Sequence, residues 1–204
     1  YIMCDPAHSR KRESNRTAIA VVGIDGNYNK FLLDGVCHRL SLSERWDALK
    51  RLRSKWKGAP GIREVKVGYE RYGAQSDIEH FKEMMRIDGS SFPVYELNWT
   101  GGGGPQSKRD RIQRLEPDLK DGSFFFPYPT DEKRLTSHQK DYKRKKQEFL
   151  ISKKILRKDE EGKVYDLVDW VRRNEYLLFP TIHPDFLDAL SRIYDMDPMP
   201  PISR

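Results

Sequence analysis

The chain begins with a short apolar segment that ends on an acid and a proline, Tyr1-Ile2-Met3-Cys4-Asp5-Pro6-Ala7. A basic loop follows, and after it comes a second apolar and β-branched run over residues 17–24. This pattern predicts two strands joined by a charged loop. An acid at the end of a buried strand is costly unless it is partnered or has a chemical role. Asp5 is therefore the first candidate functional residue.

The remaining elements alternate between strand and helix patterns. A turn signal at residues 25–27 and a third strand over 29–40 predict an antiparallel meander of three strands. Apolar spacing predicts strands over 62–70 and 92–97, an edge segment over 124–129, and helices over 44–52, 76–85, 107–115, 166–176 and 181–190. Ser41 or Ser43 can cap the first helix. We therefore expect an α/β fold with a mixed central sheet flanked by helices.

The 204 residues suffice for one well-packed domain, expected over 1–195, with a tail at 196–204. The net charge of +7 indicates a polyanionic partner, for which nucleic acid is favoured over a membrane surface. Cys4 and Cys37 form no zinc-type motif and are expected to be free, buried thiols. No run approaches the roughly 18 apolar residues that span a bilayer, so no membrane partner is expected.

Residues 133–158 hold eleven Lys or Arg against two acids. A one-signed cluster of this kind predicts a surface that tracks the phosphates of DNA, with a solvated face as the alternative. We expect a basic insertion with an exposed β-hairpin at about 130–166, in which DNA contacts come from Lys143, Arg144, Lys145 and Lys146.

Three acids stand at the ends of predicted elements. Asp5 and Glu70 close strands, and Asp185 opens the last helix, with Asp188 three residues later on the same helical face. Each acid alone is more simply read as a helix cap or the partner of an arginine. Together they form a set that can hold Mg²⁺ or Mn²⁺, with Asp185, Asp188 or both completing it.

Four segments carry a family resemblance. They are Asp5-Pro6-Ala7, Glu70 after Val65-Lys66-Val67-Gly68-Tyr69, Lys108-Arg109-Asp110-Arg111-Ile112, and His183-Pro184-Asp185-Phe186-Leu187-Asp188-Ala189-Leu190. In this order they resemble the C-terminal nuclease domain of the large terminase subunit of tailed bacteriophages. The resemblance implies an RNase H-like (RuvC-like) fold and a metal-dependent endonuclease that cuts concatemeric double-stranded viral DNA by two-metal-ion hydrolysis.

The same resemblance assigns roles. Asp5, Glu70 and Asp185 are expected to be catalytic and to bind two divalent cations, with Lys108 positioning phosphate. Apart from the resemblance, the loop residues Arg10, Lys11, Arg12 and Arg16 border Asp5 and are expected to contact DNA, with a solvated loop as the alternative. His183 and Asn15 are accessory candidates, with a cap of the last helix as the alternative for His183. Two positions depart from the family pattern, because Pro184 stands where the first acid of a His-Asp-Asp motif often lies and Asn15 stands where relatives often have Asp.

No GxxxxGK[ST] motif is present, so ATP hydrolysis is not expected from this chain. The resemblance implies an upstream ATPase domain in the same polypeptide, together with the small terminase subunit and the portal as partners. It places the protein in the host cell cytoplasm and transiently at the procapsid portal vertex, not secreted. Two alternatives remain open: another RNase H-like nuclease of the Holliday-junction resolvase or integrase type, and a non-catalytic nucleic-acid-binding module.

Overall fold

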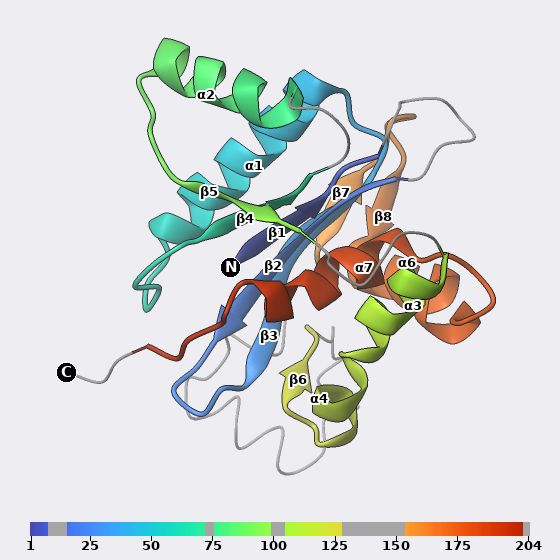
Figure 1. Ribbon diagram of the computed structural model, residues 1–204. Helices are drawn as coiled ribbons and strands as arrows, with labels where there is room; N and C mark the ends of the chain where they lie inside the picture. The colour runs from blue at the N-terminus through green and yellow to red at the C-terminus, as the bar shows by residue number, and fades with distance from the viewer. Residues whose placement is uncertain (8–15, 72–75, 99–104, 128–153, 202–204) are drawn as a thin grey trace.

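A mixed six-stranded sheet forms the centre of the protein (Figure 1). The computed structural model describes residues 1–7, 16–71, 76–98, 105–127 and 154–201. In spatial order the strands are β5 (Val94–Leu97), β4 (Val67–Glu70), β1 (Ile2–Asp5), β2 (Thr17–Ile24), β3 (Lys30–His38) and β6 (Phe124–Phe125). The β1-β2-β3 meander is antiparallel, whereas β4 pairs in parallel with β1 and β5, and β6 pairs in parallel with β3. The expected α/β class, mixed sheet and meander are confirmed.

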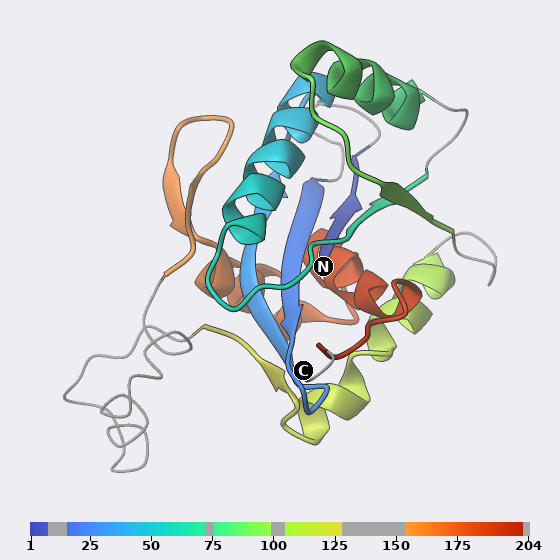
Figure 2. The ribbon, with the colours of Figure 1, turned by 90° about the vertical axis from the view of Figure 1, so that its left-hand side faces the viewer.

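Helices cover both faces of this sheet (Figures 1 and 2). On one face lie α1 (Leu42–Lys57) and α2 (Ser76–Asp88), and on the other lie α3 (Pro105–Gln113), α6 (Leu167–Asn174) and α7 (Asp185–Ser191). Successive strand residues point to opposite faces. Ile2 and Cys4 accordingly pack with α1, while Met3 packs with α7. Both faces are apolar, which explains why β1 and β2 are buried along nearly their whole length.

Local chemistry explains where α1 begins. The Ser41 hydroxyl accepts a hydrogen bond from the backbone N–H of Glu44, and the Glu44 carboxylate accepts one from the backbone N–H of Ser41. This reciprocal capping box satisfies two donors that a helix start otherwise leaves open. Of the two serines expected to cap this helix, Ser41 is the one that does so.

The helix α7 is buried on all sides, since each of its seven residues is buried. Within the expected segment 181–190 it begins at Asp185, the acid expected at its start, and residues 181–184 form a turn and an extended link. The residue before a proline disfavours helical backbone, so His183 stops the helix from extending further back. Pro184 occupies the cap position with φ −75° and ψ 128°.

The strand expected over 62–70 is also shorter and covers only Val67–Glu70. Its parallel partner β1 begins at Ile2, opposite Val67, so residues before 67 have no strand of the meander beside them. Two short 3-10 helices, η3 (Tyr176–Leu178) and η4 (Arg192–Asp195), flank α7, and α4 (Glu116–Lys120) follows α3. Met196, expected in the tail region, is buried against the sheet.

A separate antiparallel hairpin consists of β7 (Leu156–Lys158) and β8 (Val164–Asp166). It confirms the C-terminal part of the expected hairpin, and residues 128–153, with Lys143, Arg144, Lys145 and Lys146, lie outside the described residues. Cys4 and Cys37 are buried and free, as expected. Across the described ranges, no helix combines the length and apolar character required to cross a membrane.

Gly35 of β3 lies where α6 and α7 pack closely against the sheet. A Cβ atom there would lie 2.7 Å from the Ile19 carbonyl oxygen, 2.8 Å from a Phe186 ring carbon and 2.9 Å from a Leu167 methyl. We expect Gly35→Ala to lower the free energy of unfolding by about 1–3 kcal/mol, because the backbone oxygen cannot move aside. Gly26→Ala is the control, since a Cβ at Gly26 meets nothing within 4 Å. Equal thermal stability of the two variants would contradict the packing described.

Candidate metal centre

The pairing of β1 with β4 brings two acids together. Their parallel register joins Cys4 to Tyr69, so the next residues, Asp5 and Glu70, end the two strands side by side. The period-2 alternation places both on the face that carries α7, because Met3 and Gly68, two residues earlier on each strand, contact that side. Both side chains are buried, with 4% exposure for Asp5 and 6% for Glu70.

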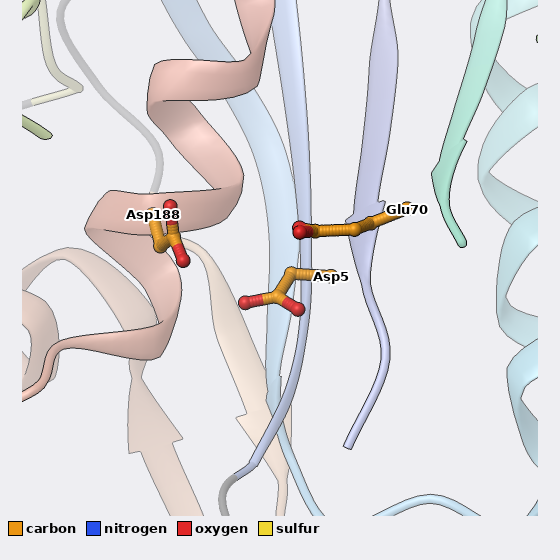
Figure 3. Close-up of side chains that lie close together, drawn as sticks. All are labelled: Asp5, Glu70 and Asp188. Carbon is orange, nitrogen blue, oxygen red and sulfur yellow. The ribbon is translucent and has the colours of Figure 1, made fainter. Parts of the chain in front are cut away.

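The helix α7 supplies the third acid, Asp188, which is fully buried. One carboxylate oxygen from each of Asp5, Glu70 and Asp188 lies within 4.8 Å of the others. Figure 3 shows the three side chains converging from two strands and a helix. Among the described residues this group has the geometry to hold a metal ion.

Asp185, the third acid expected from the sequence, lies one helical turn away and has different contacts. Its carboxylate accepts a hydrogen bond from the backbone N–H of Arg16 at 2.7 Å and another from Lys108 Nζ at 2.9 Å. Asp188, named only as an additional candidate, occupies the place beside Asp5 and Glu70 instead. A role for Asp185 as a metal ligand stays a prediction.

Cationic side chains surround the acids. Arg111 donates two hydrogen bonds to Asp188, Nε to Oδ1 at 2.8 Å and Nη2 to Oδ2 at 2.6 Å. Its Nη2 also lies 3.8 Å from Glu70. The fully buried Arg192 places Nε 3.6 Å from Glu70 Oε2 and donates a hydrogen bond to the Leu97 carbonyl. The acids are thus held by opposite charges that come from α3 and η4.

Lys108 is the central cation of the group. Besides its bond to Asp185, its Nζ lies 3.5 Å from Asp188 Oδ2 and 3.9 Å from Asp5 Oδ2. Burial disfavours the charged amine, but the nearby carboxylates outweigh burial and raise the pKa of Lys108. Lys108 is therefore a stable ammonium that occupies the space between three acids.

Burial raises the pKa of the carboxyl groups, whereas by itself it would lower that of Lys108. Burial raises the pKa of Asp5 well above its usual value; Lys108 opposes this, and the neighbouring acids add to it. Burial also raises the pKa of Glu70, against Arg192 and Arg111, which lower it. In both cases removal from water is the largest cause of the raised pKa.

One oxygen of the group lacks a hydrogen bond. Glu70 Oε2 is buried and accepts none from the described residues, because its ionic neighbour Arg192 Nε lies at 3.6 Å, beyond hydrogen-bond distance. A buried carboxylate oxygen without a donor is costly unless something binds it. Mg²⁺ takes oxygen ligands at about 2.0–2.1 Å, so opposite ligands lie about 4 Å apart. The donor set of three carboxylates fits Mg²⁺ or Mn²⁺.

Other expected site residues have varied placements. Arg16 leads into β2, and its guanidinium lies over the Trp170 ring and donates to the Cys37 carbonyl. His183 is exposed and does not cap α7. Asn15, Arg10, Lys11 and Arg12 lie outside the described residues.

Three buried residues of the site were not predicted as such: Arg111, Arg192 and Glu175. Arg111 follows Lys108 by three residues, and this spacing could have indicated a shared helical face directed at the acids. Arg192 and Glu175 lie beside the fourth family-like segment without any spacing that marks them. Comparisons with protein-family models and with curated protein sequences find no match.

Asp5 and Asp188 should respond oppositely to neutralisation. Because folding raises the pKa of Asp5, its contribution to stability is complete below its usual value of 3.8 and is lost as the pH rises above that value. We expect Asp5→Asn to raise the melting temperature near pH 8, with a smaller gain near pH 4.

Asp188→Asn leaves the buried Arg111 guanidinium without its carboxylate and should lower the free energy of unfolding by about 3–5 kcal/mol. Metal-free thermal unfolding across this pH range measures both; a destabilised Asp5→Asn variant would contradict the account.

Lys108 should compete with a cation for the acids. We expect Lys108→Met to tighten Mn²⁺ binding by about tenfold in the absence of DNA, because removing the ammonium leaves three carboxylates less neutralised. Isothermal titration calorimetry measures the affinity. Lys120→Met, which removes an exposed lysine paired with Glu116 on α4, is the control. Unchanged or weaker Mn²⁺ binding by Lys108→Met would show that Lys108 does not compete.

Proposed function

We propose that this chain is a metal-dependent DNA endonuclease domain with an RNase H-like fold, of the type found in the large terminase subunit of tailed bacteriophages. The observation that carries the proposal is the convergence of Asp5, Glu70 and Asp188 from three separate segments into one buried group. The sheet supports the fold assignment, since its antiparallel meander, extended by parallel strands and flanked by helices, is the arrangement that the sequence resemblance implies.

The chemistry of the site supports phosphodiester hydrolysis. Two divalent cations held by these carboxylates would polarise a scissile phosphate and lower the pKa of an attacking water. Asp5, Glu70 and Asp188 are the residues that would hold these cations (Figure 3). Asp185 holds Lys108 and the entry to β2 beside the acids. Lys108, whose ammonium lies beside Asp5, Asp185 and Asp188, would be placed to donate to a phosphate oxygen of the substrate.

The partner of such a site is double-stranded DNA, in keeping with the net charge of +7. Phosphate contacts of this kind provide affinity without sequence choice. The proposed function also carries the remaining expectations: an ATPase domain upstream in the polypeptide, the small terminase subunit and the portal as partners, and a place of action in the host cytoplasm at the procapsid portal vertex.

Plasmid cleavage in Mn²⁺ tests the proposal. We expect Asp5→Ala, Glu70→Ala and Asp188→Ala each to reduce cleavage by at least about 100-fold, because a lost ligand removes several kcal/mol of transition-state stabilisation. Asp185→Ala should retain measurable cleavage, since its carboxylate contacts Lys108 and Arg16 and lies outside the group of three. Asp47→Ala, on the exposed side of α1, is the control.

The same assay separates the alternatives. A wild-type chain that retains DNA with a steep salt dependence but neither cleaves it nor binds Mn²⁺ would be a non-catalytic binding module. Preferential cleavage of four-way junctions over linear duplex would identify a resolvase-type enzyme. Full activity of Asp188→Ala with complete loss in Asp185→Ala would restore Asp185 as the third ligand.

A further inference from the structure

A buried acid outside the group of three holds the helix that carries Asp188. Glu175 follows α6, is 3% exposed, and accepts hydrogen bonds from three consecutive backbone N–H groups at the start of α7. Its Oε1 accepts from Asp185 at 3.1 Å and from Phe186 at 3.0 Å, and its Oε2 accepts from Leu187 at 2.9 Å. The carboxylate therefore satisfies donors that the helix itself leaves open.

The sequence offers α7 no cap of its own. The cap position is Pro184, whose side chain makes no capping hydrogen bond. A helix of two turns is not stable by itself, so the place and rotation of α7 depend on its buried face and on Glu175. The carboxylate reaches α7 from across the turn at 179–184, and it ties the end of α6 directly to the first turn of α7.

The location of this carboxylate has a cost that a simple cap would avoid. Burial raises the pKa of Glu175 to about 7, against the hydrogen bonds from Phe186 and Leu187, while the charge of Asp185 adds to the increase. A Ser or Asp at position 184 would cap α7 with less desolvation. The costly solution is understandable if the orientation of α7 matters beyond its stability.

A second contact links this carboxylate to the sheet. Cys37 is the second-last residue of β3, and its Sγ lies 3.9 Å from Glu175 Oε1. The backbone carbonyl of Cys37 in turn accepts hydrogen bonds from Tyr165 and from Arg16. Glu175 thus fixes the start of α7 relative to the sheet whose other strands carry Asp5 and Glu70.

We propose that Glu175 is a positioning residue that sets the rotation of α7, so that Asp188 faces Asp5 and Glu70 at metal-binding distance. The inference rests on the metal-dependent nuclease function proposed above. Glu175 does not contact the cation; it acts through the backbone of Asp185, Phe186 and Leu187. Outer partners of this kind affect metal affinity by about 10–100-fold when they are lost.

Glu175→Gln tests the proposal, with Mn²⁺ affinity and plasmid cleavage as readouts. The amide keeps the shape but replaces one acceptor oxygen by a donor, which cannot bond to a backbone N–H. We expect Mn²⁺ binding weakened by about tenfold or more and cleavage reduced with it, with partial recovery at saturating Mn²⁺. Ser41→Ala is the matched control, because it removes a helix cap from α1 on the opposite face of the sheet. It should lower the melting temperature without changing Mn²⁺ affinity.

A second variant separates stability from positioning. Pro184→Ser, added to Glu175→Gln, gives α7 a local cap at a position with extended backbone. We expect the double variant to recover thermal stability while its Mn²⁺ affinity stays below that of the wild type. Wild-type Mn²⁺ affinity and cleavage in Glu175→Gln, or in the double variant if the single variant does not fold, would overturn the positioning role.

The controls also distinguish this inference from the proposed function. A wild-type chain that binds Mn²⁺ but cuts no DNA would overturn the nuclease function alone, and the Mn²⁺ affinity of Glu175→Gln would still decide the positioning role. A wild-type chain that binds no Mn²⁺ would overturn both.

Discussion

Several carboxylates buried at one end of a sheet are the constraint on which the site depends. Removal from water and mutual repulsion both oppose the charged forms of Asp5 and Glu70, as their raised pKa values indicate. The protein offsets this with Lys108, Arg111 and Arg192, each of which brings a charge from a neighbouring helix. At Glu70 Oε2 the pairing is loose, because Arg192 Nε lies 3.6 Å away and no described residue donates a hydrogen bond to that oxygen. An arrangement that sacrifices stability at one place is typical of a functional site.

Asp5 and Glu70 are held more rigidly in the site than Asp188. Asp5 and Glu70 lie on adjacent parallel strands, so the hydrogen bonds of the sheet set their separation. Asp188 lies on a helix of seven residues whose position depends on burial of its apolar side chains and on the Glu175 carboxylate. Small changes in reacting geometry are costly in catalysis, which makes the support of α7 as important as the acids themselves.

Lys108 connects the metal-free protein to the proposed function. Its ammonium group bridges Asp5, Asp185 and Asp188, in the space that a cation would share. A lysine is suited to such an exchange, because its charge is carried by a flexible stem. The bidentate Arg111–Asp188 pair is more rigid and orients the carboxylate of Asp188. The two basic residues of α3 therefore have different parts in the same site.

The sequence by itself determined the α/β class, the three-strand meander, a serine cap at residue 41 or 43, and Asp5 and Glu70 as acids at strand ends. These follow from local patterns, since alternation, turn residues and caps act within a few residues. The choice of Asp188 for the group of three was decided only by the tertiary structure, because Asp185 and Asp188 share a helical face and their spacing cannot tell which one meets the sheet. The contacts of Arg192 and Glu175 were also decided only by the tertiary structure. Their partners depend on how α6, α7 and η4 pack on the sheet, and packing brings together residues that no local sequence pattern relates.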